Sequence, residues 1–492
     1  MRVPLRTLRH VGLLALVVLL APGCGDDQIV YRDRATFNPP PDESSGFLGY
    51  FEPETKMTTC GNCHIGKQKE WETTAHADAH AGLVDSGHSQ EFCFGCHTVS
   101  DMGNDLAVAG GWNVVQDPVY QDVQCESCHG AGFDHVNDPG AAQPLPTLAV
   151  SETMDTGCAE CHSGNHHPFA EEWLNSGHAQ VVSFAAARES CAGCHRGQGA
   201  LEAWGESANY LEKDSAEHLP ITCGVCHDPH ERRYEGQLRF PVDTSSPELH
   251  LCARCHDRRT VPDANSSHGL APHSPETALL LGDAGWFPPG SGIDQGLIIA
   301  SHGSEGNPTL CASCHVYKFE VLDAETGEFV FASTGHSFKA LPCLDSQGVP
   351  SGDDACNYNS MERSFASCAT TGCHSSEVAA SSALTAATLR MELFSSDLLQ
   401  SLTMVDPNLD SAGGEIDAGD PTFTVAEGAY FNYNLANHGG SVIGSATHNP
   451  FLTEALLIAS INAVFDEYGV RPSRAMDYRA ELRKLLERAG RS

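Results

Sequence analysis

The chain has 492 residues, enough for two to four ordinary domains, but it carries 21 cysteines, 47 glycines and 27 prolines. Regular apolar runs are sparse between residues 60 and 374, which excludes one large side-chain core there. A net charge of −36 at pH 7 excludes nucleic acid and anionic lipid as partners and favours proteins that are basic at the contact. A solvated acidic surface kept for solubility is the simpler alternative.

Residues 1–23 are predicted to be an export signal. Three arginines precede an apolar run, residues 11–21, that is too short to span a bilayer. The run ends in "LAPGC", where Cys24 stands like the acylated cysteine of a bacterial lipoprotein; simple cleavage after Gly23 is the alternative. Cleavage leaves 25 basic against 64 acidic side chains, a charge of −39. Residues 24–59, with "NPPPDESSG", are expected to be an extended tether.

Eighteen cysteines fall into nine pairs, each followed by a histidine. Eight pairs have the form Cys-x-x-Cys-His, namely Cys60/Cys63/His64, Cys93/Cys96/His97, Cys125/Cys128/His129, Cys158/Cys161/His162, Cys191/Cys194/His195, Cys223/Cys226/His227, Cys252/Cys255/His256 and Cys311/Cys314/His315. The ninth, "CATTGCH", has four intervening residues and comprises Cys368, Cys373 and His374.

Cys-x-x-Cys-His is the attachment motif of c-type haem. Two thiols add to the two vinyl groups of one porphyrin, and the adjacent imidazole binds the iron. Zinc sites and redox dithiols do not require a histidine after each pair. The sequence therefore predicts nine haems c, with a disulfide as the alternative at the widened ninth motif.

Two further cysteines, Cys343 and Cys356, are followed by Leu344 and Asn357 and offer no adjacent imidazole. A disulfide closing this short loop is expected, with two free thiols as the alternative.

The first six motifs form a tandem three-haem repeat, residues 60–135 and 158–230. Corresponding motifs begin 98 residues apart, at 60 and 158, 93 and 191, and 125 and 223. Each copy also has a tryptophan five residues before a His-Ala pair and a histidine shortly after its third motif. A seventh motif completes the region 60–256.

Sixteen of the 26 histidines remain when His10 and the nine motif histidines are set aside, more than nine haems need for a second axial ligand each. The repeat favours four as distal ligands: His76, His135, His178 and His230. Five more are candidates: His268, His273, His302, His336 and His448. The other seven are expected mainly at the surface or in the core: His80, His88, His166, His167, His218, His250 and His438.

The expected fold is mainly α and irregular, with little β. Residues 60–374 give 35 residues per motif, so short helices and loops must wrap closely packed haems. The segment 257–374 holds motifs eight and nine and a long insertion whose "GWFPPGSG" is expected to be a loop and not a core element. Residues 375–492 are expected to be a helical region, with helices over 376–404 and 451–488.

The stretches "VQCESCHGAGFDH", "CGVCHDPH" and "GNCHIGKQKEWETTAHA" resemble multihaem c-type cytochromes of the cytochrome c-552 and c-554 type, which are related to hydroxylamine oxidoreductase and octahaem tetrathionate reductase. The resemblance extends to "FNYNLANHGGSVIGSATHNP", which in that group returns a late distal histidine, here His448. It implies covalent haem and electron transfer or small-molecule redox chemistry.

Two functions follow. The first is an electron carrier with mostly bis-histidine haems, a periplasmic or outer-membrane lipoprotein of a Gram-negative bacterium, held to the membrane by lipid alone. The second is an oxidoreductase acting on small nitrogen or sulfur compounds at one open haem. Related enzymes often use a lysine ligand there, and the candidate region has only Lys67, Lys69, Lys213, Lys318 and Lys339. A homo-oligomer through the C-terminal helices is a further expectation.

Overall fold

The computed structural model describes residues 37, 39–140, 143–164, 166–206, 208–263, 271–296, 301–304, 306–407 and 422–489. The chain divides into two compact units, Met1–Pro39 and Pro40–Ser492, and the account below concerns the second. The expected signal segment, the lipidation site Cys24 and the candidate ligand His268 lie outside the described residues.

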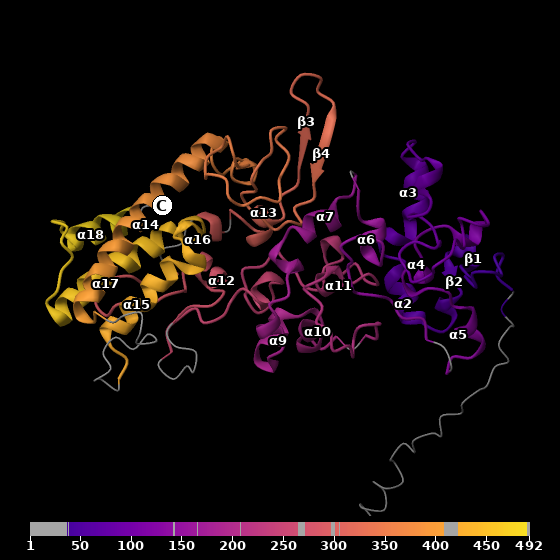
Figure 1. Cartoon of the computed structure of the whole chain (residues 1–492), viewed down its shortest axis with the longest axis horizontal. Helices are drawn as coiled ribbons and strands as arrows, with labels where there is room; N and C mark the ends of the chain where they lie inside the picture. Colours follow the sequence, from indigo (N-terminus) through magenta and orange to yellow (C-terminus); the bar gives the residue numbers. More distant parts are fainter. Residues whose placement is uncertain are drawn as a thin grey trace, which may run out of the picture. The chain divides into compact units, whose positions relative to one another are not determined.

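Short helices and loops make up the region of the motifs (Figure 1). Its α-helices are α2 Ile65–Trp71, α3 Ala79–Asp85, α4 Cys125–His129, α5 Phe133–Asn137, α6 Cys158–Cys161, α7 Phe169–Leu174, α8 Ser183–Ala186, α9 Glu189–His195, α10 Gly197–Ala203, α11 Cys223–Cys226, α12 Glu276–Leu281 and α13 Cys311–His315. Five of these helices contain all or part of a motif. A helical turn places residues three and four apart on one face, where both cysteines and the histidine can meet one flat group.

Two small antiparallel hairpins supply the described strands, in agreement with the expectation of little β. The first pairs β1 (Tyr50–Glu52) with β2 (Met57–Thr58). The second pairs β3 (Phe319–Leu322) with β4 (Phe329–Ser333) and carries the chain from the eighth motif toward His336.

The C-terminal part is a helical bundle in which α14, α15, α17 and α18 lie side by side (Figure 1). Its helices are α14 Glu377–Val405, α15 Val425–Ala436, α16 Ile443–His448, α17 Pro450–Tyr468 and α18 Tyr478–Ala489. The stretch 451–488 is mainly helical, as expected, and consists of α17 and α18, because Gly469 adopts a left-handed conformation (φ 69°) that ends α17. None of the described helices combines the length and apolar character that a membrane-spanning segment needs.

The largest apolar core lies in this bundle and not around the motifs. Its fully buried side chains include Leu398, Leu435, Leu457 and Ile458. The clusters among the first six motifs are far smaller, for example Phe47, Val99 and Tyr120. The interior of the motif region therefore depends on something besides its own side chains.

The "GWFPPGSG" segment is a loop, as expected, but the expectation that it stays outside the core is wrong. Trp286 and Phe287 pack against the bundle core. The side chain of Asn432, 1% exposed, accepts from the Trp286 backbone N–H (2.7 Å) and donates to the Trp286 carbonyl (2.7 Å). One buried amide thus satisfies both backbone groups of a loop residue.

Cys343 and Cys356 form a disulfide, as predicted. The Arg363 guanidinium donates to the carbonyls of Leu341, Asp354 and Cys356, so the loop that the disulfide closes is also held from within.

Replacing Asn432 by alanine should lower the free energy of unfolding by about 2 to 4 kcal/mol, because the buried Trp286 N–H and C=O both lose their partner. The shift is measured by guanidinium unfolding followed by circular dichroism. Glu392→Ala, an exposed change on α14, is the control and should stay within about 0.5 kcal/mol of the parent protein. An equal effect of the two substitutions would contradict this account of Asn432.

Candidate haem-binding sites

Four motifs are closed by the same backbone hydrogen bond. The N–H of the motif histidine donates to the carbonyl of the first cysteine at 2.9 Å, from His64, His162, His227 and His256. This bond folds the two cysteines and the histidine into a single turn, so that two thiols and one imidazole lie on the same side of it.

The widened ninth motif closes in the same way. The N–H of His374 donates to the carbonyl of Cys368 at 3.0 Å, although five residues lie between them. The extra residues form a turn of their own, in which the N–H of Cys373 donates to the Thr370 carbonyl at 3.0 Å. The insertion therefore lengthens the loop and leaves the relation between first cysteine and histidine intact.

The eighteen motif cysteines differ in exposure. Fifteen are half-buried, whereas Cys63 of the first motif, Cys158 of the fourth and Cys373 of the ninth are exposed. Covalent attachment at Cys63, Cys158 and Cys373 therefore stays a prediction, with which their exposure is compatible.

Eight of the nine motif histidines face a second histidine, with ring centres 5.9–6.3 Å apart. The pairs are His64 with His135, His129 with His230, His162 with His76, His195 with His273, His227 with His336, His256 with His178, His315 with His448 and His374 with His302. All eight partners belong to the nine distal candidates predicted from the sequence.

This spacing fits an iron ion between two imidazoles. An iron about 2 Å from each nitrogen, with each nitrogen about 1.1 Å from its ring centre, puts the centres about 6.2 Å apart. Direct stacking of two rings allows shorter distances than this. The residues present therefore fit a haem whose iron has two axial histidines.

The other ring nitrogen of these histidines has a hydrogen-bond acceptor in most sites. The Nδ1 atoms of His129, His227 and His315 lie 2.6–3.0 Å from the carbonyls of Pro144, Gly236 and Phe338. Two of the partner histidines show the same contact. Nδ1 of His302 lies 2.6 Å from the Thr447 carbonyl, and Nδ1 of His448 lies 2.9 Å from the Gly444 carbonyl. A proton held on Nδ1 leaves Nε2 as the free lone pair, which is how ligating histidines are normally oriented.

Burial keeps several of these imidazoles neutral. It lowers the pKa of His162, His178 and His448 to about 4, with neighbouring histidines adding to the effect. A neutral imidazole is the form that binds a metal.

The two repeat copies place their paired histidines by the same contacts. Trp71 Nε1 donates to the Val123 carbonyl (2.9 Å), and the Val123 N–H donates to the carbonyl of His76 (3.1 Å). In the second copy, Trp173 Nε1 donates to the Ile221 carbonyl (2.8 Å), and the Ile221 N–H donates to the carbonyl of His178 (3.1 Å). Val123 and Ile221 each stand two residues before a third motif, so tryptophan, histidine and motif are fixed together.

Two buried glutamates hold the backbone around the sites. Glu126, inside the third motif, accepts from the N–H groups of Leu48, Gly49 and Gly132 at 2.7–3.0 Å. Burial raises the pKa of Glu126 to about 7 despite these three donors. Glu172 on α7 accepts from the Thr334 N–H (2.9 Å) and the His336 N–H (2.7 Å), and so joins the second repeat to the segment carrying His336. Neither glutamate was singled out from the sequence, because nothing local marks it as buried.

His97 of the second motif differs from the other eight. Among the described residues no second histidine faces it at the spacing of the eight pairs, while its Nδ1 lies 3.0 Å from the Ala79 carbonyl. His80 packs instead on Phe94 and Trp112 (5.4 and 5.3 Å), and His166 stacks on Phe329 (5.9 Å).

One cluster has the composition of a small metal site. Ligand atoms of His250, Cys252 and Cys311 lie within 4.8 Å of one another. The two cysteines belong to the seventh and eighth motifs, whose histidines face His178 and His448. Their contact is better explained by two adjacent haem attachment points.

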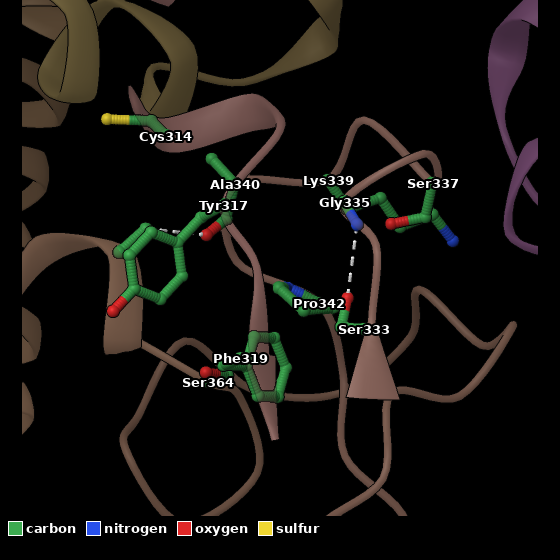
Figure 2. A pocket seen from close by; sticks show the side chains of 11 residues that line it. Cys314, Tyr317, Phe319, Ser333, Gly335, Ser337, Lys339, Ala340, Pro342 and Ser364 are labelled. Carbon is green, nitrogen blue, oxygen red and sulfur yellow. Dashed lines mark hydrogen bonds between the residues drawn. The ribbon is translucent and has the colours of Figure 1, made fainter. Parts of the chain in front are cut away.

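Two of the five lysines are paired with acidic side chains, and a small cavity lies beside the eighth motif. Lys67 pairs with Glu70 (2.6 Å), and Lys339 pairs with Asp354 (2.9 Å). Figure 2 shows the cavity between the eighth motif and the β3–β4 hairpin, lined by Cys314, Tyr317 and Lys339 among others. Its volume is about 10 Å³, which is about the room that one water molecule needs.

Comparison with known proteins gives matches of two kinds. The family described as "Cytochrome c554 and c-prime" matches residues 59–130, and the "Doubled CXXCH motif" family matches residues 218–260. A solved structure, described as the crystal structure of the outer cell wall cytochrome OcwA, aligns with a TM-score of 0.52 at 15% identity, covering 85% of this chain and all of that one. No curated protein matches.

These matches support a multihaem c-type cytochrome. The mainly helical and irregular fold of the chain is that of such a cytochrome, and both family matches fall on its motifs. In this class covalent haem supplies one-electron redox chemistry when bound, and electron transfer is the function that follows from it.

Replacing Glu126 by alanine should destabilise the cytochrome by about 3 to 5 kcal/mol, since three buried N–H groups lose their acceptor. Glu126→Gln keeps an oxygen acceptor and mimics the protonated carboxyl. Because burial raises the folded pKa to about 7, above its ordinary value of 4.5, stability from this group is greatest below pH 4.5 and is lost as the pH rises through 7.

The measurement is the unfolding midpoint of the haem-loaded protein at pH 5, 6, 7 and 8. The unfolding midpoint of Glu126→Gln should be close to that of the parent protein at pH 5 and should exceed it increasingly toward pH 8. The midpoint of Glu126→Ala should be lower than both. The exposed Glu91→Ala is the control. A constant difference between Glu126→Gln and the parent at all four pH values would contradict the raised pKa.

Proposed function

We propose that this cytochrome carries nine covalently bound haems and relays electrons through them, with eight irons held between two histidines. The observation that carries the proposal is the set of eight histidine pairs at 5.9–6.3 Å, each containing one motif histidine. Two axial histidines fill both open positions of a haem iron, which favours electron transfer over substrate binding.

Contacts between cysteines of different motifs support a continuous row. Side-chain contacts join Cys60 with Cys125, Cys158 with Cys223, and Cys252 with Cys311, which connects motif one with three, four with six, and seven with eight. Weaker electrostatic interactions link motif three with four, six with seven, and eight with nine. Since each cysteine marks an attached edge of its haem, the main row runs one, three, four, six, seven, eight, nine.

The second and fifth motifs form branches from this row. The thiols of Cys96 and Cys161 interact, and so do those of Cys194 and Cys255. These contacts join motif two to four and motif five to seven. In this arrangement electrons can travel the length of the chain without entering either branch.

We further propose that the cytochrome works outside the cytoplasm as a lipoprotein anchored through Cys24, periplasmic or at the outer membrane. The support is the N-terminal sequence, the disulfide between Cys343 and Cys356, and similarity to a cytochrome described as one of the outer cell wall. The acidic surface favours redox partners that are basic at the contact. Exposed Val378, Leu389 and Met404 on α14 favour self-association through the C-terminal helices.

A second candidate function is reduction or oxidation of a small nitrogen or sulfur compound at the haem of the second motif. One observation favours this site over the other eight: among the described residues, no second histidine faces His97 at the spacing of the eight pairs. A branch at the side of the row suits a site where electrons leave for a small substrate.

Haem count tests the ninth motif. The intact mass of the mature cytochrome should exceed that of its polypeptide by nine haems, and the double variant Cys368→Ala/Cys373→Ala should lose one. The control Cys343→Ser/Cys356→Ser removes the disulfide and should keep all nine. A parent protein with eight haems would reject the ninth site.

Spin state tests the histidine pairing. His273→Ala should convert one haem from low to high spin, because the iron bound by His195 loses its second imidazole. Electron paramagnetic resonance of the ferric protein measures the change as the appearance of one high-spin signal. His88→Ala, at an exposed position, is the matched control. If His273→Ala has as many low-spin haems as the parent protein, then His273 is not an axial ligand and iron binding does not explain its spacing from His195.

A further inference from the structure

The two side branches of the proposed haem row stand at equivalent positions of the repeat. Motifs one to three form the first unit, motifs four to six the second, and motif seven opens a third. Histidine pairs interlock these units, since His162 of motif four faces His76 and His256 of motif seven faces His178, each in the unit before. Motif two touches motif four, and motif five touches motif seven in the same way. The two branches can therefore be compared residue by residue.

Charge is distributed unevenly between the two branches. Residues 35–187, which contain motifs one to four, have no arginine, whereas residues 188–259, with motifs five to seven, have eight. The contrast reaches the motifs themselves, because motif four is "CAECH" and motif seven is "CARCH". Glu160 and Arg254 thus occupy the same position, with a carboxylate at one branch and a guanidinium at the other.

Four arginines lie beside the contact between motifs five and seven, and we call them the branch-five arginines. They are Arg196, Arg254, Arg258 and Arg259. Arg196 directly follows His195 of motif five, and the carbonyl of Arg254 accepts from the Cys194 thiol of that motif (3.9 Å). The Arg254 guanidinium lies 3.4 Å from the centre of the Phe240 ring, which keeps its charge close to the motif.

Arg258 and Arg259 lie against the segment that carries His273, the histidine that faces His195. The Arg258 N–H donates to the carbonyl of Ser274, the next residue after His273 (3.0 Å). Arg259 has a left-handed backbone (φ 44°), which costs free energy in a residue with a side chain. Burial and then the charge of Arg259 lower the pKa of His273, which agrees with this placement.

The branch-five arginines have no carboxylate partner among the described residues. The nearby Arg239 pairs with Glu206 (3.1 Å) and Asp228 (3.4 Å), whereas none of the four forms an ion pair within the described part of the chain. The Nε atoms of Arg196 and Arg254 are buried there without a hydrogen-bond acceptor. In a chain with 64 acidic and 28 basic side chains, four unpaired guanidinium groups at one place indicate an anionic partner from outside the polypeptide.

The surface at this branch has the composition of a protein contact. Arg258 is exposed. Phe184 on α8 is 66% exposed, and the Arg188 guanidinium lies 3.8 Å from the centre of its ring. Helix α8 packs against α9, which contains motif five. Aromatic residues and arginine are the side chains enriched in protein interfaces.

Branch two has the opposite charge. Glu160 of motif four accepts from the Gly103 N–H that follows motif two (2.7 Å), and the exposed Glu91 precedes motif two. Burial raises the pKa of Glu160, and the charges of Asp101 and Asp155 add to this effect against the Gly103 hydrogen bond. An acidic partner would be repelled at branch two and attracted at branch five.

We propose that branch five is the docking site of an acidic redox protein, which binds to Arg258 and its neighbours and takes one electron from the haem of motif five. The ferrous iron of that haem is oxidised to ferric, and the oxidised partner is reduced by one electron. Positive charge beside the haem stabilises its ferrous form, so that electrons collect where this partner binds. The inference rests on the proposed relay and adds the place where electrons leave it.

Two oxidants of opposite charge test the site, the anion ferricyanide and the cation hexaammineruthenium(III). Each is mixed with the reduced, haem-loaded cytochrome in a stopped-flow instrument. Ferricyanide should oxidise Arg258→Gln/Arg259→Gln about tenfold more slowly than the parent protein at about 0.01 M salt, because two attracting charges are lost. The difference should shrink as the salt concentration rises to about 0.5 M, where charges are screened. Oxidation by hexaammineruthenium(III) should be at least as fast as in the parent protein.

A second pair of arginines provides the matched control. Arg483→Gln/Arg488→Gln removes two charges from exposed positions on α18 and should leave both rates unchanged. Arg258→Gln alone, at an exposed position, should give the same pattern with a smaller effect, so the result does not depend on the folding of the double variant. The number of low-spin haems, measured by electron paramagnetic resonance, should equal that of the parent protein in every variant.

Three results would count against these proposals, each at a different level. Equal slowing with both oxidants, or none with either, would overturn the docking site. If Arg258→Gln/Arg259→Gln changes neither rate but lowers the reduction potential of the high-spin haem in a His273→Ala background, the arginines bind the carboxylates of the haem itself and the docking site is wrong. If His273→Ala produces no high-spin haem, the histidine-paired relay fails, whatever the oxidants show.

Discussion

The separation of about six ångströms between paired imidazoles is the constraint on which the rest of the structure depends. The separation recurs in all eight pairs whatever the angle between the two rings, from 12° to 73°, and it matches an iron bound from both sides. Three features near the motifs help to maintain this separation. They are the turn that brings two cysteines and a histidine together, the carbonyls beside Nδ1, and the tryptophans that position a histidine in each copy of the repeat. The polypeptide thus holds the paired imidazole rings at a fixed distance from each other.

This constraint explains why the chain has two kinds of interior. The C-terminal bundle buries leucine, isoleucine and phenylalanine from four helices in one contiguous core. Around the motifs the apolar clusters are small, as with Ala200, Leu201 and Tyr210, and buried polar groups such as Glu126 and Glu172 carry the long-range contacts. A region packed around flat aromatic groups needs few large side chains. It must, however, provide hydrogen-bond partners for the backbone N–H and C=O groups that are buried between those flat groups.

Local features could be predicted from the sequence, whereas contacts between distant segments could not. Motif spacing predicted nine attachment turns, and the repeat singled out His76, His135, His178 and His230, each of which faces a motif histidine in the structure. It could not assign partners, because most pairs cross unit boundaries: His76 faces His162 and not its own His64. The same limitation hid the role of "GWFPPGSG", whose Trp286 packs on the bundle core and is hydrogen-bonded by Asn432, 146 residues away. Glycine and proline marked the loop correctly, but its packing is decided by a helix far along the chain.

Interlocking has a mechanical consequence for the relay. If each unit supplied both axial histidines of its own haems, the units could separate without disturbing any iron. Here His178, after the fourth motif, faces His256 of the seventh, and His230, after the sixth motif, faces His129 of the third, so in the proposed relay separating these groups of motifs would break metal–ligand bonds at both boundaries. A row of redox centres conducts only while neighbouring edges stay in contact, and ligands exchanged across every boundary make that contact a condition of coordination. Among the described residues His97 of the second motif shows no such pairing, so the haem proposed there would not be tied to a boundary in this way.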